Sequence, residues 1–205
     1  MIQPIIMCKA PVAGRVKTRL IPAYTPVQAA EIHATMAVTV IERLGKLFPH
    51  TWIAVDELNH PFFHRFEFRQ VQQGGGDLGR RMSRLLQQAC AAGATGALFL
   101  GVDSPHMGEA RIQQAVQGLG QANVVIGPVE DGGYELIALD GCYKSIFENI
   151  EWGGSQVCAQ TIAAAHAAGL RVNQLLMGFD VDLPDDVARA VQSGWGKGAR
   201  FVIGN

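Results

Sequence analysis

The stretch ALFLGVDSP, residues 97–105, decides the fold class that we expect for this chain. Its first part, residues 97–102, is a continuous apolar run of strand length, which is typical of a strand buried on both faces. Such strands occur in parallel sheets that carry helices on both sides. The run stops abruptly at Asp103, so this carboxylate is expected at the mouth of the sheet.

Strand-length apolar runs and helical patterns alternate along the rest of the chain. Thr25 and Pro26 predict the N-cap and first residue of a long helix, and Asp77 is expected to cap another. Further helices are expected from about Glu109, over 143–149, over 155–168 and from Pro184. Strands are expected at 2–8, 51–56, 66–73, 97–102, 123–129, 134–139 and 170–176. This alternation predicts an α/β fold with a Rossmann-like, doubly wound, mainly parallel sheet, in a single domain over residues 1–205.

The composition indicates a globular enzyme or binding protein. The 205 residues are 48% hydrophobic and 17% charged, and the net charge is -1, so we expect no nucleic-acid partner. No apolar stretch approaches the roughly 20 residues of a membrane span, and Lys9 and Pro11 interrupt the opening run too early for a signal peptide. These features predict a cytoplasmic protein. The cysteines show no metal-ligand spacing and are interpreted as reduced core residues.

Four cations crowd the stretch KAPVAGRVKTRL, residues 9–20, directly after the first expected strand. Several cations on one loop can neutralise a diphosphate or triphosphate. The loop is not a Walker A motif, which requires G-x-x-x-x-G-K-[ST], because Gly14 is its single glycine. Each cation by itself is most simply a solvated residue of a basic turn. Together, Lys9, Arg15, Lys17 and Arg19 predict a phosphate site.

Two carboxylates are candidate ligands for a divalent cation. Asp103 follows a buried strand and Asp182 precedes the last helix, so both side chains could face the crevice at the carboxyl ends of the strands. Mg²⁺ prefers one or two carboxylates together with phosphate oxygens. The alternative for Asp103 is to cap a turn before Pro105.

Two glycine-containing stretches are further candidates for ligand contacts. QGGGDLGRRM, residues 73–82, is either a flexible loop with a helix N-cap or a helix N-terminus that offers N–H groups to a ligand. GPVEDGGYELIAL, residues 127–139, holds a Gly pair that forms a hairpin turn or lets the backbone approach a sugar or acceptor. The aromatic rings of Tyr134 and Trp152 could stack on a base or sugar, although packing is their commoner use.

Five stretches carry a resemblance that covers nearly the whole chain: KAPVAGRVKTRL, QGGGDLGRRM, GVDSP, PVEDGGYELIAL and DVDLPDDV. In this order they resemble the DUF2064 family of GT-A-type glycosyltransferases, which is related to nucleotide-diphospho-sugar transferases. The chain more weakly resembles guanylyltransferases that make the phospholactyl part of coenzyme F420, which share the KTRL loop, and the molybdenum-cofactor nucleotidyltransferases. The resemblance implies a GT-A-type fold and a transferase that uses Mg²⁺ or Mn²⁺, a nucleotide sugar and a small-molecule acceptor.

The resemblance also implies roles for individual residues. The expected nucleotide-binding residues are Lys9, Ala10, Pro11, Gly14, Arg15, Lys17, Thr18, Arg19, Gly76 and Asp77. The expected metal ligands are Asp103 and Asp182, the expected substrate-binding residues are Gly132, Gly133, Tyr134 and Trp152, and Asp131 is the candidate general base. The stretch WGGSQV, residues 152–157, departs from the Trp-Ser-Thr turn that such proteins often carry, so two hydroxyls are missing there.

Two other functions remain compatible with these residues. A nucleotidyltransferase would bind a nucleoside triphosphate at the same site and release pyrophosphate, and four cations suit a triphosphate somewhat better than a diphosphate. A non-catalytic nucleotide-binding regulator would bind without turnover, an interpretation that the missing Ser-Thr dipeptide favours.

Overall fold

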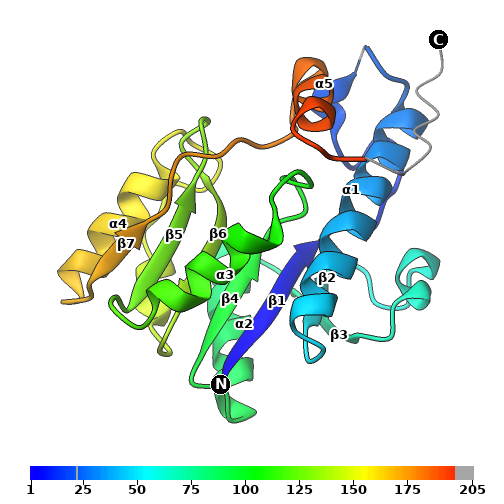
Figure 1. The fold of residues 1–205 in the computed structure, drawn as a ribbon. Helices are drawn as coiled ribbons and strands as arrows, with labels where there is room; N and C mark the ends of the chain where they lie inside the picture. Colours follow the sequence, from blue (N-terminus) through cyan, green and yellow to red (C-terminus); the bar gives the residue numbers. More distant parts are fainter. Residues whose placement is uncertain (22, 197–205) are drawn as a thin grey trace.

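One mixed seven-stranded sheet forms the centre of the computed structural model, which describes residues 1–21 and 23–196 (Figure 1). Its strands are β1 (Ile2–Cys8), β2 (Trp52–Val55), β3 (Arg69–Gln72), β4 (Gly96–Leu100), β5 (Val124–Pro128), β6 (Tyr134–Leu139) and β7 (Val172–Gln174). They are ordered β3-β2-β1-β4-β6-β5-β7. Neighbouring strands are parallel, except that β6 runs antiparallel to both β4 and β5. The prediction of an α/β fold with a mainly parallel, doubly wound sheet is therefore confirmed.

Helices cover both faces of this sheet. The α-helices are α1 (Pro26–Leu47), α2 (Leu78–Ala91), α3 (Glu109–Gly118), α4 (Val157–Ala167) and α5 (Pro184–Gln192). Short 3₁₀ helices are η1 (Thr18–Leu20), η2 (Pro61–Arg65) and η3 (Lys144–Phe147). Helices α1 and α3 pack on one face, and α2 and α4 on the other (Figure 1).

The helix expected over 143–149 is wrong in type and length. The structure has the short 3₁₀ helix η3 there, because Glu148 is extended and Asn149 has a φ of 58° in the left-handed region. The predicted N-caps are confirmed elsewhere. The Thr25 side chain accepts a hydrogen bond from the N–H of Gln28 in a capping box, and Asp77 accepts from the N–H of Arg80.

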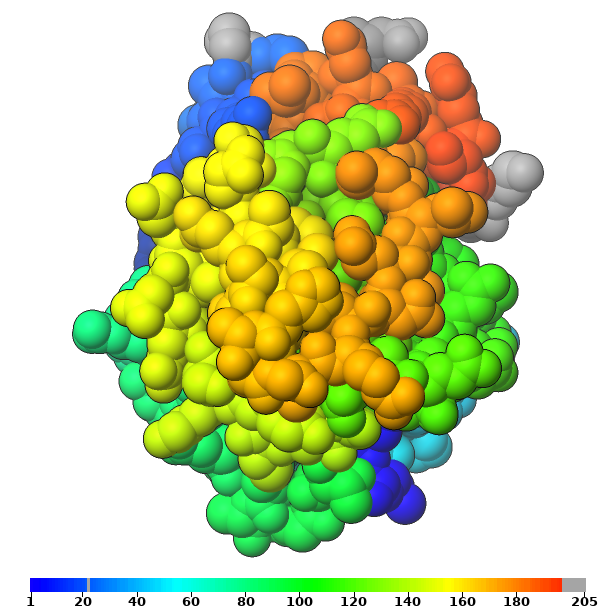
Figure 2. Space-filling model, turned by 90° about the vertical axis from the view of Figure 1, so that its left-hand side faces the viewer, coloured from blue at the N-terminus to red at the C-terminus, as the bar shows by residue number. Residues whose placement is uncertain are grey.

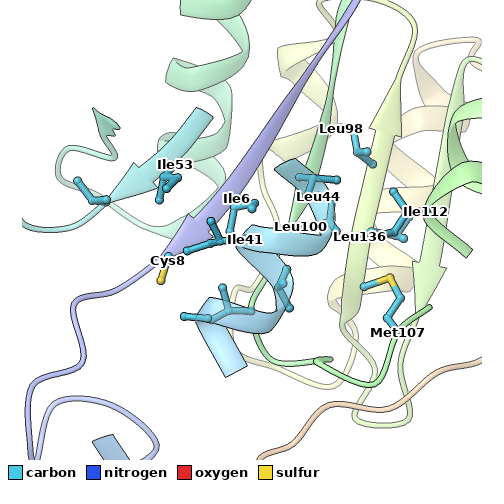
Figure 3. Packing of buried hydrophobic residues seen from close by; sticks show 14 of the residues in the cluster. Ile6, Cys8, Ile41, Leu44, Ile53, Leu98, Leu100, Met107, Ile112 and Leu136 are labelled. Carbon is cyan, nitrogen blue, oxygen red and sulfur yellow. The ribbon is translucent and has the colours of Figure 1, made fainter. Parts of the chain in front are cut away.

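The strands send apolar side chains to both faces of the sheet. In β4, Leu98 and Leu100 join the core cluster beneath α1 and α3, whereas Ala97 and Phe99 join the cluster beneath α2 and α4. Figure 3 shows the first of these clusters. Burial of one such leucine stabilises the fold by about 1.5–3 kcal/mol, so β4 is firmly anchored just before the loop that carries Asp103.

The connections bring three loops to one edge of the sheet. From β1 the chain builds β2 and β3 on one side and then returns to place β4 on the other side of β1. The carboxyl ends of β1 and β4 therefore lie side by side, at the kind of switch point where doubly wound folds bind ligands. Because β6 is antiparallel to β4, its first residue, Tyr134, starts at the same edge.

A crossing segment, residues 175–183, runs from β7 along this edge to α5 (Figure 1). Figure 2 shows the beginning of this segment, in orange, on the surface beside α4 in yellow. Backbone hydrogen bonds attach it to the sheet edge, from the N–H of Gly178 to Pro128 O (2.8 Å) and from the N–H of Val181 to Asp103 O (2.8 Å). Among the helices of the described residues, none combines the length and the apolar composition that a membrane span requires.

Candidate functional site

A cleft of about 710 Å³ opens where the carboxyl ends of β1 and β4 meet, a size typical of small-molecule sites. Of the residues expected in the site, those that line the cleft are Lys9, Arg15, Lys17, Thr18, Arg19, Asp103, Asp131, Gly133, Tyr134, Trp152 and Asp182. Those that do not line it are Ala10, Pro11, Gly14, Gly76, Asp77 and Gly132. The loop after β1, the loop after β4, the turn before β6 and the crossing segment therefore contribute to one site.

Lys17 bridges the two candidate metal ligands. Its Nζ lies 2.6 Å from Oδ1 of Asp103 and 2.8 Å from Oδ1 of Asp182. The Lys17 side chain is only 6% exposed. Lys17 directly precedes η1, and its backbone adopts the left-handed conformation with a φ of 47°. Arg19 donates from Nη1 to the other oxygen of Asp182 at 2.9 Å. The expectation that Asp103 and Asp182 face one crevice is therefore met, with a lysine ammonium between them.

The charges of this cluster stabilise one another. Although burial would by itself lower the pKa of Lys17, the carboxylates of Asp103 and Asp182 raise it above its ordinary value. Burial would likewise raise the pKa of Asp103, but the Lys17 ammonium outweighs it and lowers that pKa. At neutral pH Lys17 is therefore a cation and Asp103 an anion.

The other two cations of the opening loop have open surroundings. The Arg15 side chain is 62% exposed and lies 4.0 Å from Asp56 and 3.8 Å from Glu57, at the long end of an ion pair. Lys9 is exposed, and its carbonyl contacts Nε2 of the His33 ring at 2.9 Å. Both side chains can therefore turn toward an anion in the cleft without losing a close partner.

The loop backbone itself faces other parts of the protein. The N–H of Ala10 donates to Oδ1 of Asp56 at 2.7 Å, so it is not free for a phosphate. Pro11 lies beside α1, where it lines a separate small concavity with Ala30 and Ala34. Gly14 has a φ of 77°, which a glycine adopts without strain, so it shapes the turn rather than the cleft wall.

The glycine-rich stretch before α2 is held by its own helix. The Arg84 guanidinium donates to the carbonyls of Gln73 and Gly75, and Arg81 donates to the carbonyl of Gly76 at 2.9 Å. The Asp77 carboxylate is used as the N-cap of α2. Gly76 and Asp77 thus shape the helix start, and the cleft wall is formed by Gln73, Leu78 and Arg81 instead.

Arg81 is a cleft cation that the sequence pattern did not reveal. The stretch QGGGDLGRRM contains both Arg80 and Arg81, but only the orientation of α2 separates them. Arg81 lines the cleft, whereas the Arg80 side chain is 78% exposed and lies 3.8 Å from Asp77. The sequence thus indicated that an arginine could reach the cleft, because two arginines lie in the first turn of a helix that begins at the ligand-binding edge, but it did not indicate which one.

The turn before β6 places Asp131 at the cleft. Oδ1 of Asp131 accepts a hydrogen bond from the N–H of Gly133 at 2.8 Å, which fixes the carboxylate while leaving its second oxygen available. Gly132 has a φ of 89°, and a Cβ there would lie 1.9 Å from the carbonyl oxygen of Ser155. The close approach that this glycine allows is therefore to the backbone of Ser155, not to a ligand as the sequence suggested.

The stretch WGGSQV forms one wall of the cleft. Trp152 meets Tyr134 edge to face, with ring centroids 6.4 Å apart, and its indole lies against Gly79 of α2, where a Cβ would clash. Ser155 lines the cleft despite its displacement from the expected turn. Burial raises the pKa of the Tyr134 hydroxyl, so this group stays protonated. The two rings thus pack against each other and also line the cleft.

Two acidic side chains of the cleft lie outside the set expected from the sequence. Burial and the negative charge of Asp103 raise the pKa of Asp180 to about 7. The hydrogen bond that Ser104 donates to Asp180 at 2.7 Å lowers this pKa, but by less than burial raises it. Burial also raises the pKa of Glu135, which pairs with Arg111. The sequence signal for Glu135 was a single charge within the apolar run YELIAL.

The donor set at Asp103 and Asp182 fits a divalent cation in kind but is already engaged. Mg²⁺ commonly takes one or two carboxylates and completes its shell with phosphate oxygens and water. Among residues 1–21 and 23–196, no group of three or more His, Cys, Asp or Glu is arranged to hold a metal ion. Lys17 and Arg19 hold both oxygens of Asp182. Both aspartates therefore already have cationic partners in this structure.

The cysteines correct the interpretation made from the sequence. Cys90 of α2 and Cys142, which follows β6, form a disulfide, whereas Cys8 and Cys158 are free and buried. Cys142 lies on an exposed loop, not in the core. The spacing of 52 residues gave no indication of this pair, because their proximity depends on how α2 packs beside the end of β6.

Comparisons with known proteins agree with this fold. A family model described as "Uncharacterized protein conserved in bacteria (DUF2064)" matches residues 49–154, just over half of the chain. A structure from Desulfovibrio desulfuricans G20, described as a "putative nucleotide-diphospho-sugar transferase", is 28% identical with a TM-score of 0.81. That match covers 89% of this chain and 84% of the other. The comparison with curated proteins found no match.

More distant structures share the fold alone. CMP:2-keto-3-deoxy-manno-octonic acid synthetase, solved with CTP, has a TM-score of 0.59 at 13% identity, covering 93% of this chain and 98% of that one. Rv0371c from Mycobacterium tuberculosis H37Rv, solved in complex with manganese, has a TM-score of 0.54 at 16% identity, with the same coverage. The fold is thus shared by proteins named as a "putative nucleotide-diphospho-sugar transferase" and as a CMP:2-keto-3-deoxy-manno-octonic acid synthetase.

Proposed function

The chain belongs to the DUF2064 family, and we propose that it is a metal-dependent transferase with a nucleotide sugar as donor and a small-molecule hydroxyl compound as acceptor. The observation that carries this proposal is the charge arrangement of the cleft. Cations from two elements and carboxylates from three loops line one space at the switch point of the sheet. The similarity to the 28% identical structure supports the same reaction class.

The cations of the cleft are suited to a diphosphate. Lys9, Arg15 and Arg19 are exposed on the opening loop, and Arg81 adds a positive charge from α2. Charge-assisted hydrogen bonds from such groups bind phosphate oxygens strongly. In the proposed reaction they also stabilise the negative charge that develops on the diphosphate as its bond to the sugar breaks.

Asp131 is the proposed general base. Its oriented carboxylate accepts the proton of the acceptor hydroxyl, whose oxygen forms a bond to the anomeric carbon while the nucleoside diphosphate leaves. Trp152 and Tyr134 line the same cleft and would pack against the sugar or the acceptor. Asp103 and Asp182 would hold Mg²⁺ or Mn²⁺, which supplies further positive charge at the diphosphate.

Nucleotidyl transfer is the second candidate function, and Arg81 is the observation that favours it. A fifth cation, beyond the four of the opening loop, extends the positive surface of the cleft and suits a triphosphate. In this case an acceptor oxygen attacks the α-phosphorus, and pyrophosphate leaves. A non-catalytic regulator would bind nucleotide without either product.

Calorimetry with nucleoside diphosphates and triphosphates, each with Mn²⁺, tests the proposal. Arg81→Met should weaken binding about tenfold, because a hydrogen bond to a charged group contributes about 1.5–3 kcal/mol. Arg80→Met is the matched control, since the Arg80 side chain is 78% exposed and does not line the cleft, and this variant should bind as the wild type does. Equal affinities for both variants and the wild type would contradict a phosphate site here.

The product then separates the candidate functions. Release of a nucleoside diphosphate from a nucleotide sugar supports glycosyl transfer, and release of pyrophosphate from a triphosphate supports nucleotidyl transfer. Binding without turnover, over a panel of sugar and phosphate acceptors, would support the regulator instead.

A further inference from the structure

Lys17 is set apart from the other cations of the opening loop. Its side chain is 6% exposed, whereas those of Arg15 and Arg19 are 62% and 61% exposed. Its φ of 47° and ψ of 40° lie in the left-handed region, which residues other than glycine rarely adopt. The backbone is thus held in an uncommon conformation that directs the ammonium between Asp103 and Asp182.

The ammonium and a divalent ion cannot share this place. Nζ lies within 2.8 Å of a carboxylate oxygen of each aspartate, and Mg²⁺ binds such oxygens at about 2.0–2.1 Å. An ion held by both Oδ1 atoms would therefore overlap the ammonium. Lys17 and Arg19 already neutralise the two carboxylates, so an added divalent charge would also be repelled by both cations.

We propose that Lys17 and the divalent cation are alternative occupants of the Asp103–Asp182 pair. In the ligand-free protein the lysine ammonium fills the place and excludes the metal. When nucleotide phosphates and metal bind together, the ammonium leaves the aspartates for the phosphate oxygens, and the metal takes its position. The second step rests on the proposed function, whereas the first concerns metal binding alone.

The side chain and the cleft permit this exchange. Lysine carries a compact charge on a flexible four-carbon stem, so it can swing while its backbone stays fixed. Thr18 and Arg19, the next two residues, line the same cleft where phosphates are expected. Metal and nucleotide would then each raise the affinity of the other, because binding linkage is reciprocal.

A purely structural ammonium makes the opposite prediction. In that case Lys17 acts as a permanent tie between the opening loop and the crossing segment, across 165 residues of sequence. Its removal would loosen Asp182 and leave metal affinity unchanged or lower. The affinity for metal without nucleotide therefore separates the two roles.

Calorimetric titration with Mn²⁺ alone tests the exchange. Lys17→Met keeps the length of the side chain without its charge, and it should raise Mn²⁺ affinity at least tenfold over the wild type. Arg19→Met is the matched control, because it removes a charge from the same Asp182 carboxylate without clearing the place between the aspartates. It should raise the affinity much less. Unchanged or weaker Mn²⁺ binding by Lys17→Met would overturn the proposal.

A double variant locates the ion. Asp103→Asn added to Lys17→Met should remove the gain in Mn²⁺ affinity, and a gain that persists would place the ion elsewhere and overturn the proposal. If Lys17→Met does not fold, the wild type provides the measurement through acetylation of Lys17 by an N-hydroxysuccinimide ester, followed by mass spectrometry. Saturating Mg²⁺ should increase the reactivity of Lys17, and an unchanged rate would contradict the exchange.

Nucleotide titrations distinguish failure of this inference from failure of the proposed function. In the wild type, a nucleoside diphosphate should raise Mn²⁺ affinity, and Lys17→Met should lose most of this coupling. A rise in Mn²⁺ affinity for Lys17→Met, with no nucleotide binding by any variant, supports the exclusion of metal by Lys17 and contradicts the proposed function. Nucleotide binding, with no effect of Lys17→Met on Mn²⁺ affinity, supports the proposed function and contradicts the exclusion of metal by Lys17.

Discussion

The Arg111 guanidinium of α3 and the Glu135 carboxylate of β6 form a buried ion pair beside the cleft. The Glu135 side chain is 2% exposed and that of Arg111 is 20% exposed. Arg111 also donates to the carbonyl of Leu176 at 2.7 Å, which attaches the crossing segment to α3. The pair thus links a helix, the sheet and the segment that carries Asp180 and Asp182.

Removal of one partner should destabilise the protein strongly. Arg111→Met should lower the free energy of unfolding by about 3 kcal/mol, because it leaves the Glu135 charge buried without compensation. Adding Glu135→Gln should restore part of the loss, and urea denaturation measures both. Lys46→Met, which breaks the exposed pair with Glu109, should change stability by about 0.5 kcal/mol or less. An equal loss in the Arg111 and Lys46 variants would contradict the importance of burial.

Gly132 should tolerate substitution poorly for a steric reason. In Gly132→Ala, the Cβ would lie 1.9 Å from the carbonyl oxygen of Ser155, in a conformation with a φ of 89°. Gly153 is a matched control, since it has the same φ and nothing lies within 4 Å of the position that a Cβ would take there. Gly153→Ala should cost about 1 kcal/mol for the left-handed backbone, and Gly132→Ala clearly more. Thermal unfolding of the two variants checks this order.

The sequence was sufficient for the fold because its apolar runs are long and regular. The run before Asp103 becomes β4, buried on both faces, and Thr25 and Asp77 cap the helices as expected. The direction of β6 could not be read, since YELIAL has the same apolar pattern whether it pairs parallel or antiparallel. That direction nevertheless decides that Asp131, at the turn before β6, reaches the cleft.

Contacts across long sequence separations were the part of the site that could not be predicted in detail. The Lys17 ammonium lies between two aspartates, one of which arrives on the crossing segment 165 residues later. Arg81 faces the cleft and Arg80 does not, which depends on the rotation of α2 about its axis. Residue types thus indicated a phosphate and metal chemistry, while the pairing of charges required the packed structure.

The Cys90–Cys142 disulfide should contribute measurably to stability. Closing a loop of this length, with a separation of 52 residues, stabilises a protein by about 2–4 kcal/mol through the unfolded state. Reductant should therefore lower the urea midpoint of the wild type and leave that of a Cys90→Ser/Cys142→Ser variant unchanged. Thiol titration of the unfolded, unreduced protein should find only Cys8 and Cys158 reactive. Reaction of all four cysteines would show that the bond is absent in solution.

His106 should make the protein less stable in mild acid. Its ring stacks on Phe179 with centroids 3.8 Å apart, and among the described residues its buried Nδ1 has no hydrogen-bond partner. Burial, aided by the positive charges of Arg189, Arg43 and Arg111, lowers the pKa of His106 to about 4.

Because the unfolded state binds this proton at a pKa of about 6.5, the stability from neutral His106 is present above pH 6.5 and is lost as the pH falls toward 4. His106→Phe keeps a ring in the stack and removes the titration. Between pH 7 and 4 the wild type should lose about 2 kcal/mol more unfolding free energy than this variant. The raised pKa of Asp180 has the opposite effect, because the stability that its protonated form contributes is lost as the pH rises toward 7. This effect is the same in the wild type and in His106→Phe, so it cancels when their pH profiles are compared. Parallel pH profiles of the two proteins in urea denaturation would show that His106 is protonated as easily in the folded state as in the unfolded state.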